Sequence, residues 1–239
     1  MTRHKLTSSL VLVPGLLLDH ALWEPQIAAL SGICAPWVAD LRREGSIAAM
    51  ASRVLAEVAA QPFALAGLSM GGYVAMEIMR QAPQRVTKLA LLDTRATLDT
   101  PEETARRHEL IRLAQAERGF APVTARMLPL LVHPERVSDE PLVRVIREMA
   151  ERVGVEAYVR HQQAMMARPD FRTVLPHIGC PTLVLCGRQD ALTPLERHEE
   201  IVRHVRAARL VVIERCGHLP TLERPHEVNV ALRDWLLGP

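Results

Sequence analysis

The segment Gly67-Leu68-Ser69-Met70-Gly71 constrains the fold of this 239-residue chain more than any other. It has the spacing G-x-S-x-G, and it stands between the apolar run 63–66 and a helical pattern over 72–81. A strand-to-helix turn this tight crowds its own backbone, so glycine at 67 and 71 removes side chains that would clash, and the serine takes a strained conformation. The pattern predicts that Ser69 is held out at the carboxyl edge of a sheet as a candidate nucleophile.

Short apolar strands alternate with helical patterns on both sides of this turn. The expected strands cover 10–13, 33–39, 63–66, 88–92, 182–185 and 210–213. The expected helices of this alternation cover 23–30, 47–60, 72–81, 193–206 and a final segment from 225. Short apolar strands separated by helices predict the α/β class, with a mostly parallel sheet of about six strands and helices on both faces.

The alternation is interrupted once, between residues 97 and 176. Helical patterns cover a segment from 100 to 118, a segment around 142–149 with i, i+3, i+4, i+7 spacing, and, after a break at Gly154, a segment from 155 to 166. No strand pattern is convincing there. We therefore expect a helical cap, or lid, over residues 97–176, inserted into a core formed by residues 1–96 and 177–239.

Two of the expected helices begin with the pattern of a capping box, in which a threonine and a glutamate three residues later bond each other's backbone N–H groups. Thr100 and Glu103 form the first, with Pro101 in the first turn, a position that suits proline. Thr193 and Glu196 form the second.

Composition and charge narrow the partners that we expect. The net charge is +2, and arginine carries nearly all the positive charge because the chain has only two lysines, Lys5 and Lys88. The arginines alternate with glutamates on predicted helix faces, as in 148–152, which indicates a solvated surface and no nucleic-acid groove. No run approaches the roughly 18 apolar residues of a membrane span, and the first residues lack a secretory signal. We expect a cytoplasmic protein, with no membrane or nucleic-acid partner, that takes a small molecule.

A serine hydroxyl needs a general base, and histidine fills that role because its pKa lies near neutrality. His218 is the best placed of the ten histidines, because it follows the last strand in a loop, and the ligand crevice of a parallel sheet lies beyond the carboxyl ends of its strands. His226, at the start of the final helix, is the alternative base. His198 and His204 fall in a polar helical pattern, and we expect them at the surface.

The base in turn needs a carboxylate that fixes its tautomer and stabilises its charged form. Asp190 is favoured because it lies just beyond the strand 182–185. Asp93 is the competitor, because it ends the strand 88–92 and could face the same crevice.

Two backbone N–H groups are expected to stabilise a developing oxyanion. Met70 provides one at the start of the helix that follows the serine, where the helix dipole favours negative charge. Leu16 provides the other, in the turn after the first strand, where Gly15 allows a close approach.

The pocket is harder to predict from the sequence. Candidate wall residues are Leu16, Leu17, Met70, Leu128, Met165 and Met166. Candidate cations for an anionic substrate are Arg95, Arg168 and Arg188. Neither a cluster of metal ligands nor a G-x-G-x-x-G pattern is found, so we expect no metal and no organic cofactor.

Together these motifs resemble the α/β-hydrolase fold family, in particular the lid-bearing group that includes carboxylesterases, enol-lactonases and carbon–carbon hydrolases. The resemblance covers essentially the whole chain, and the order Ser69, Asp190, His218 matches the order Ser…Asp…His of that family. The segments that carry it are 11–15 for the oxyanion strand, 67–72 for the serine turn, 187–190 for the acid and 216–218 for the base. One departure is Pro14, which stands where the family usually has histidine, and another is a shorter loop at 40–46.

The resemblance implies hydrolysis of a small carboxylic ester through an acyl-enzyme. A serine at position 69 argues against the members of this fold that use aspartate as nucleophile, the epoxide hydrolases and haloalkane dehalogenases. Hydrolysis of a carbon–carbon bond in a keto-acid, or of an enol-lactone, is the alternative reaction. A non-catalytic small-molecule receptor that keeps the same residues is the alternative from a different class.

Overall fold

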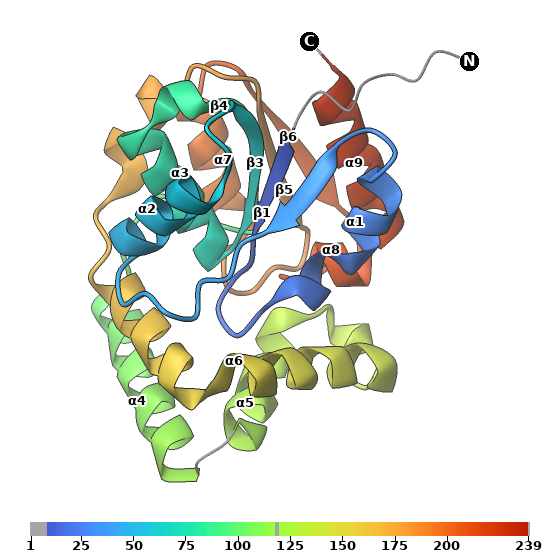
Figure 1. Ribbon diagram of the computed structural model, residues 1–239. Helices are drawn as coiled ribbons and strands as arrows, with labels where there is room; N and C mark the ends of the chain where they lie inside the picture. Colours follow the sequence, from blue (N-terminus) through green and yellow to red (C-terminus); the bar gives the residue numbers. More distant parts are fainter. Residues whose placement is uncertain (1–8, 118–119, 239) are drawn as a thin grey trace.

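A single parallel sheet forms the centre of the protein (Figure 1), whose computed structural model describes residues 9–117 and 120–238. Six strands pair in the order β2-β1-β3-β4-β5-β6, and every pairing is parallel. The strands are β1 (Ser9–Val13), β2 (Ala35–Val38), β3 (Phe63–Leu68), β4 (Val86–Leu92), β5 (Thr182–Gly187) and β6 (Ala208–Ile213). The predicted class and the predicted number of strands are confirmed.

Helices cover both faces of the sheet, as expected for strands that are buried on both sides. One face carries α1 (Glu24–Leu30), the short α8 (Pro220–Glu223) and α9 (Pro225–Leu237). The other face carries α2 (Ile47–Glu57), α3 (Met70–Gln81) and α7 (Leu195–His204).

The side chains of β1 show how the sequence builds these two layers. Successive residues of a strand point to opposite faces, so Val11 and Val13 join one apolar cluster, while Leu10 and Leu12 join the other. All four are fully buried. A strand with two buried faces has a continuous apolar sequence, and β1 was predicted from this pattern.

Three α-helices and three short 3-10 helices lie between β4 and β5 in the described part of the chain. The α-helices are α4 (Pro101–Glu117), α5 (Ala121–Leu131) and α6 (Glu140–Met166). They form a layer of their own beyond one end of the sheet (Figure 1). Gly154, with φ 81° and ψ 158°, interrupts the helical backbone inside α6, so the two helices expected on either side of it form one kinked element. The helix α5 was not predicted from the sequence.

The two predicted capping boxes have different outcomes. At the start of α4, the backbone N–H of Thr100 donates to Oε2 of Glu103 (2.8 Å) and the backbone N–H of Glu103 donates to Oγ1 of Thr100 (3.2 Å), so the first box is confirmed. The second is wrong, because α7 begins at Leu195 without a side-chain cap and the hydroxyl of Thr193 donates to Asp190 instead. Across the described ranges, we find no helix with the length and apolar character needed to span a bilayer.

Candidate active site

Ser69 occupies the sharp turn between β3 and α3. Its backbone has φ 56° and ψ −117°, a left-handed conformation that is uncommon for a residue with a side chain. Its N–H donates to the carbonyl of Leu92 (2.9 Å) at the end of β4, and its carbonyl accepts the N–H of Gly72 (2.9 Å). The strain is therefore held in place by the neighbouring strand and by the first turn of α3.

The glycines on either side of Ser69 are required by close backbone contacts. A Cβ on Gly67 would lie 2.2 Å from the carbonyl oxygen of Gly71, and a Cβ on Gly71 would lie 2.1 Å from the carbonyl oxygen of Val13. Because these neighbours are backbone atoms, they cannot swing aside as a flexible side chain would. The steric reason given for both glycines in the sequence analysis agrees with these contacts.

A chain of hydrogen bonds joins Ser69 to His218 and Asp190. Nε2 of His218 lies 2.9 Å from Oγ of Ser69, and Nδ1 of His218 lies 2.8 Å from Oδ2 of Asp190. A carboxylate only accepts, so Nδ1 carries the proton and neutral His218 has Nε2 free to accept the serine hydroxyl. The loop that carries His218 is anchored by its N–H, which donates to the carbonyl of Leu131 at the end of α5 (2.9 Å).

Asp190 is buried, yet it is held as a carboxylate by four donors. Its Oδ1 accepts the N–H groups of Leu192 (2.8 Å) and Thr193 (3.0 Å), and its Oδ2 accepts the hydroxyl of Thr193 (2.5 Å) besides His218. Burial raises the pKa of Asp190, but the interaction with His218 and the hydrogen bonds from Thr193 outweigh burial and lower the pKa to about 2. Asp190 is thus ionised at neutral pH.

Asp93 lies in the same buried region as Asp190 but has fewer hydrogen-bond donors around its carboxyl group. Its Oδ1 accepts the N–H of Gly187 (2.9 Å), while its Oδ2 is buried and has no hydrogen-bond partner among the described residues. Burial, followed by the nearby charge of Asp190, raises the pKa of Asp93 well above its usual value. Asp93 therefore favours the neutral acid.

Asp93, Asp190 and His218 are also the one group of possible metal ligands found among the described residues, with one donor atom from each within 4.8 Å of the others. The two oxygens of Asp190 and the Nδ1 atom of His218 already take part in the hydrogen bonds described above. We interpret this cluster as a hydrogen-bonded acid–base group.

The positions of two further histidines, His198 and His226, bear on the predictions made from the sequence. His198 is fully buried on α7, so its expected surface position is wrong. Its Nε2 accepts the N–H of Thr94 (3.0 Å), which leaves the proton on Nδ1, 3.3 Å from the carbonyl of Pro194. Burial lowers the pKa of His198 to about 4, so it is a neutral structural residue. The alternative base, His226, is exposed on α9.

The two expected oxyanion donors lie beside Ser69. Met70 is the first residue of α3, and a Cβ on Gly15 would lie 3.2 Å from Cβ of Ser69, so the turn before Leu16 passes directly over the serine. Within residues 9–117 and 120–238, neither Leu16 N–H nor Met70 N–H donates to a protein acceptor. Leu17 follows with φ 60°, which places the bend of this turn next to the expected donor.

A cavity of about 310 Å³ opens onto Ser69 and His218. Of the pocket residues predicted from the sequence, Leu16, Leu17, Arg95 and Met165 line it. Met70, Leu128 and Met166 are not among the lining residues, and Met70 and Leu128 pack in the apolar core. Since α5 was not predicted, its buried and cavity-facing sides were not assigned from the sequence. Met127, next to Leu128 on this helix, is the residue that lines the cavity.

The three candidate cations lie in different environments. Arg188 is half-exposed and pairs with Glu214 (2.7 Å), away from the cavity lining. Arg168 is buried against Asp99 (2.9 Å), with its guanidinium 4.3 Å from the ring centre of Tyr73. Arg95 is on the cavity wall and pairs with Asp99 and Glu103.

One face of α4 is the feature of the cavity that the sequence analysis did not identify. Glu103, Arg106, Arg107 and Leu110 all line the cavity, and their spacing is i, i+3, i+4 and i+7. This spacing is visible in the sequence, but it combines three charged residues with one leucine. Because helix faces were predicted from the spacing of apolar residues, this charged face of α4 was not recognised as part of a pocket.

Comparisons with known proteins find relatives over most of this chain. The family described as the alpha/beta hydrolase family matches residues 10–231. A pimeloyl-[acyl-carrier protein] methyl ester esterase from Neisseria meningitidis is 29% identical over 198 residues, which span 80% of this chain and 76% of that protein.

Solved structures extend the likeness over nearly the whole chain. A thermophilic esterase from Thermogutta terrifontis, solved with malate bound, superposes with a TM-score of 0.87 and 34% identity, and the match covers 96% of this chain and 89% of that one. The enol-lactonase from Burkholderia xenovorans LB400 has a TM-score of 0.88 at 24% identity, over 99% of this chain and 94% of that one, and supports the fold alone.

Proposed function

This chain belongs to the α/β-hydrolase family, and on that premise we propose that it is a serine esterase that hydrolyses a small carboxylic ester. The observation that carries the proposal is the continuous hydrogen-bond chain from Oγ of Ser69 through the ring of His218 to Asp190, with distances of 2.9 and 2.8 Å. The esterases among its relatives favour an ester over other acyl compounds.

In the proposed first step, Oγ of Ser69 attacks the ester carbonyl while Nε2 of His218 takes the hydroxyl proton. The 2.9 Å separation between these atoms is within the range required for general-base catalysis. Asp190, ionised because its pKa is lowered to about 2, stabilises the imidazolium that forms and holds Nδ1 as the donor.

The tetrahedral intermediate carries a negative charge on the former carbonyl oxygen. We assign the N–H groups of Met70 and Leu16 to bind it, because one begins α3 and the other lies in the turn that packs against Ser69. Loss of one such donor lowers the rate by about 10²- to 10³-fold in comparable sites.

Collapse of the intermediate expels the alcohol, which takes the proton from Nε2 of His218. The acyl group stays on Oγ of Ser69 as an ester. Water then attacks this acyl-enzyme with His218 again as the base, which releases the acid and restores the hydroxyl.

We further propose that residues 97–176 act as a lid on a core formed by 1–96 and 177–239. The cavity supports this division, because residues of α4, α5 and α6 face Ser69 and His218 across it. Closing a site in this way excludes bulk water and strengthens electrostatic interactions within it.

A second reaction, the hydrolysis of an enol-lactone or of a carbon–carbon bond in a keto-acid, is favoured by one observation. Such substrates are anionic, and the cavity lining includes Arg95, Arg106, Arg107 and Arg197 but one acidic residue, Glu103, among the described residues. The same Ser69 chemistry would open the lactone, so substrate assays separate the two reactions.

The test is hydrolysis of p-nitrophenyl esters of graded acyl length, together with thioesters and lactones. We expect Ser69→Ala to lower kcat on the preferred substrate by about 10⁶-fold, as for other serine nucleophiles, with unchanged circular dichroism. Ser52→Ala is the matched control, since Ser52 is exposed on α2. Wild-type protein that binds a ligand tightly but turns over none of these compounds would instead be a receptor.

A further inference from the structure

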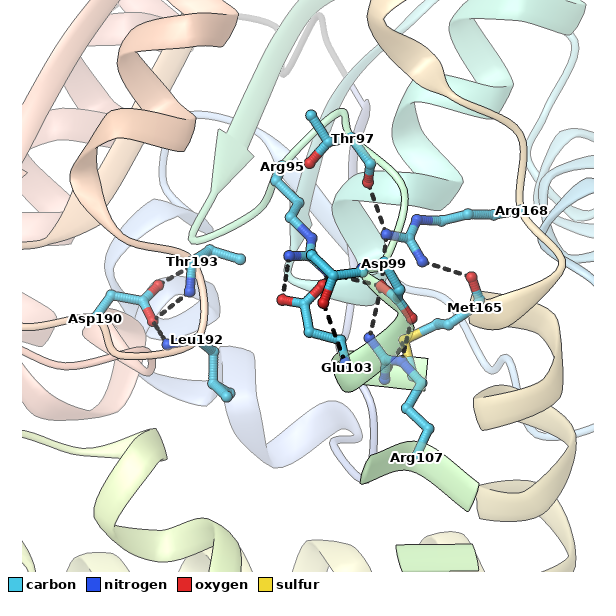
Figure 2. Close-up of polar contacts among 11 residues, drawn as sticks. Arg95, Thr97, Asp99, Glu103, Arg107, Met165, Arg168, Asp190, Leu192 and Thr193 are labelled. Atoms are coloured by element: carbon cyan, nitrogen blue, oxygen red, sulfur yellow. Dashed lines mark hydrogen bonds and ion pairs between the residues drawn. The ribbon is translucent and has the colours of Figure 1, made fainter. Parts of the chain in front are cut away.

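A buried cluster of charged residues forms the wall of the cavity beside α4 (Figure 2). It consists of Arg95, Asp99, Glu103, Arg107 and Arg168, which we call the arginine cluster. In Figure 2 the cluster lies apart from Asp190, Leu192 and Thr193. It is therefore a second polar region of the site, distinct from the group around His218.

Asp99 is at the centre of the arginine cluster. It accepts Nη2 of Arg95 (2.6 Å), Nε of Arg107 (2.5 Å) and Nη2 of Arg168 (2.9 Å), and its side chain is 3% exposed. Burial raises the pKa of Asp99, but the guanidinium groups of Arg107 and Arg168 lower it well below its usual range. Glu103 pairs through both oxygens with Arg95, at 2.6 and 2.9 Å.

The charges of the arginine cluster do not balance. Three guanidinium groups face two carboxylates, so one positive charge is left over. The carboxylate of the nearby Asp170 does not remove it, because that carboxylate is paired with Arg172. A buried excess charge is costly unless a counter-ion meets it. Nε of Arg95, on a side chain 5% exposed, has no acceptor in the described part of the chain.

The excess charge faces the reaction site. Arg95 and Arg107 line the same cavity as Ser69. Two more lining residues, Arg106 and Arg197, form no ion pair with any residue in the described ranges. The potential inside the cavity is therefore positive, and it attracts an anionic ligand toward α4.

The rest of the lining is mainly apolar. Leucine and methionine side chains such as Leu17, Leu110 and Met165 surround the space between the serine and the charged wall. A ligand that fills this cavity thus meets the reactive serine, an aliphatic stretch and a cationic wall.

We propose that the substrate is a half-ester of a small aliphatic dicarboxylic acid, whose free carboxylate is held by the α4 side of the cavity while its ester lies at Ser69. This inference rests on the proposed esterase function and specifies its substrate class. A carboxylate carries one negative charge, which matches the single excess positive charge of the arginine cluster. Guanidinium groups suit it because their planar forks pair with carboxylate oxygens.

The first experiment compares monomethyl esters of succinic, glutaric and adipic acids with the dimethyl esters of the same acids. We expect kcat/KM to be higher for the half-ester by about tenfold or more, mainly through KM, because a charge-assisted hydrogen bond is lost with the neutral diester. Equal or lower kcat/KM for the half-ester overturns the proposal. A methyl ester ending in phosphate is run alongside, and a preference for it overturns the carboxylate assignment.

The second experiment changes the cavity charge without disturbing the buried pairs. The double variant Arg106→Gln/Arg197→Gln should reduce the preference for half-ester over diester several-fold. Arg203→Gln on α7 is the control, because Arg203 is exposed and outside the cavity lining, and it should keep the wild-type preference. Arg107→Met tests the cluster itself, with its melting temperature measured first. An unchanged preference in both the double variant and a folded Arg107→Met protein contradicts the inference.

Binding is measured independently of turnover by titrating glutarate into Ser69→Ala protein in a calorimeter. We expect saturable binding that weakens as salt rises and that the double variant loses, whereas glutaramide, the neutral analogue, should bind at least about tenfold more weakly. Ser69-dependent hydrolysis of neutral esters without any preference for the anion would leave the esterase function in place and refute this inference alone. Absence of Ser69-dependent hydrolysis would refute the esterase function instead.

Discussion

Asp93 and Asp190 share one buried pocket at the ends of β4 and β5, yet their surroundings shift the two pKa values in opposite directions. One donor atom of each lies within 4.8 Å of the other and of His218. Asp190 receives four hydrogen bonds, and its pKa falls to about 2. Asp93 receives one from Gly187, and burial together with the charge of Asp190 raises its pKa. Two adjacent carboxyl groups do not both ionise readily, and the donors decide which one does.

The first prediction concerns which carboxylate supports His218. Asp190→Asn should lower kcat by about 10⁴-fold, because an amide in place of the carboxylate leaves the ring in the wrong tautomer. Asp93→Asn should lower it less than about tenfold, since Asp93 does not bond His218 and its raised pKa favours the neutral form. Steady-state kinetics on the best ester decides between them. A large loss in Asp93→Asn with a small loss in Asp190→Asn would assign the acid to Asp93.

The raised pKa of Asp93 predicts that the stability of the protein depends on pH. The pKa of Asp93 is raised on folding, so above the unfolded value of about 3.9 the folded state keeps a proton that the unfolded state releases. Stability therefore falls as pH rises through this window. Asp93→Asn removes this loss of stability at higher pH, and asparagine tolerates the φ of 43° at this position.

Urea unfolding at pH 5 and pH 8 measures this effect. The free energy of unfolding of Asp93→Asn relative to wild type should increase between the two pH values. Asp170→Asn is the control, because a hydrogen bond from Arg172 lowers the pKa of that carboxyl, and it should gain nothing as pH rises. A flat difference for Asp93→Asn would mean that Asp93 is ionised in the folded protein.

The strands of the sheet were predictable from the sequence, because their composition and the residues that follow them are both distinctive. Buried parallel strands are continuous apolar runs, and a glycine or a polar residue marks the end of several of them, as Gly187 does for β5 and Asp93 does after β4. Local chemistry also predicted the start of α4, since Thr100 and Glu103 bond each other within one turn. It failed at Thr193, because Asp190, three residues earlier in the chain, accepts the same hydroxyl.

Residues of the site were predictable where a strand end or a glycine marked them. Ser69, Asp190 and His218 follow strands and come together as expected. His198 was not predictable, because its burial depends on how α7 packs against the loop at Thr94, and a polar helix pattern does not reveal that contact. The arginine cluster depends likewise on how α4 and α6 cross, as in the 2.8 Å bond from Arg107 to Gln162.

A third prediction follows from the buried imidazole of His198. Burial lowers its pKa to about 4, whereas an unfolded histidine titrates at about 6.5. The unfolded state therefore binds the proton first, and stability falls as pH drops from about 6.5 to about 4. The ring should remain neutral at pH 5.5 with its proton on Nδ1, which nitrogen NMR of the imidazole detects.

Replacing His198 tests the same contact at neutral pH. His198→Leu leaves the buried N–H of Thr94 without its acceptor, and it should cost about 1–3 kcal/mol in the free energy of unfolding. His204→Leu is the control on the same helix, because His204 is exposed. Equal stability of the two variants would show that the Thr94 N–H finds another partner.

The last prediction concerns the turn that holds Ser69. Gly71→Ala places a Cβ 2.1 Å from the carbonyl oxygen of Val13, and both partners are fixed, one at the start of α3 and the other at the end of β1. The helix must then move away from the strand, so we expect a loss of more than about 3 kcal/mol in stability. Gly179→Ala is the control, since no heavy atom lies within 4 Å of its added Cβ. It should change stability by less than about 0.5 kcal/mol. Thermal and urea unfolding measure both, and a Gly71→Ala protein with wild-type stability and ester turnover would contradict the close packing of β1 against α3.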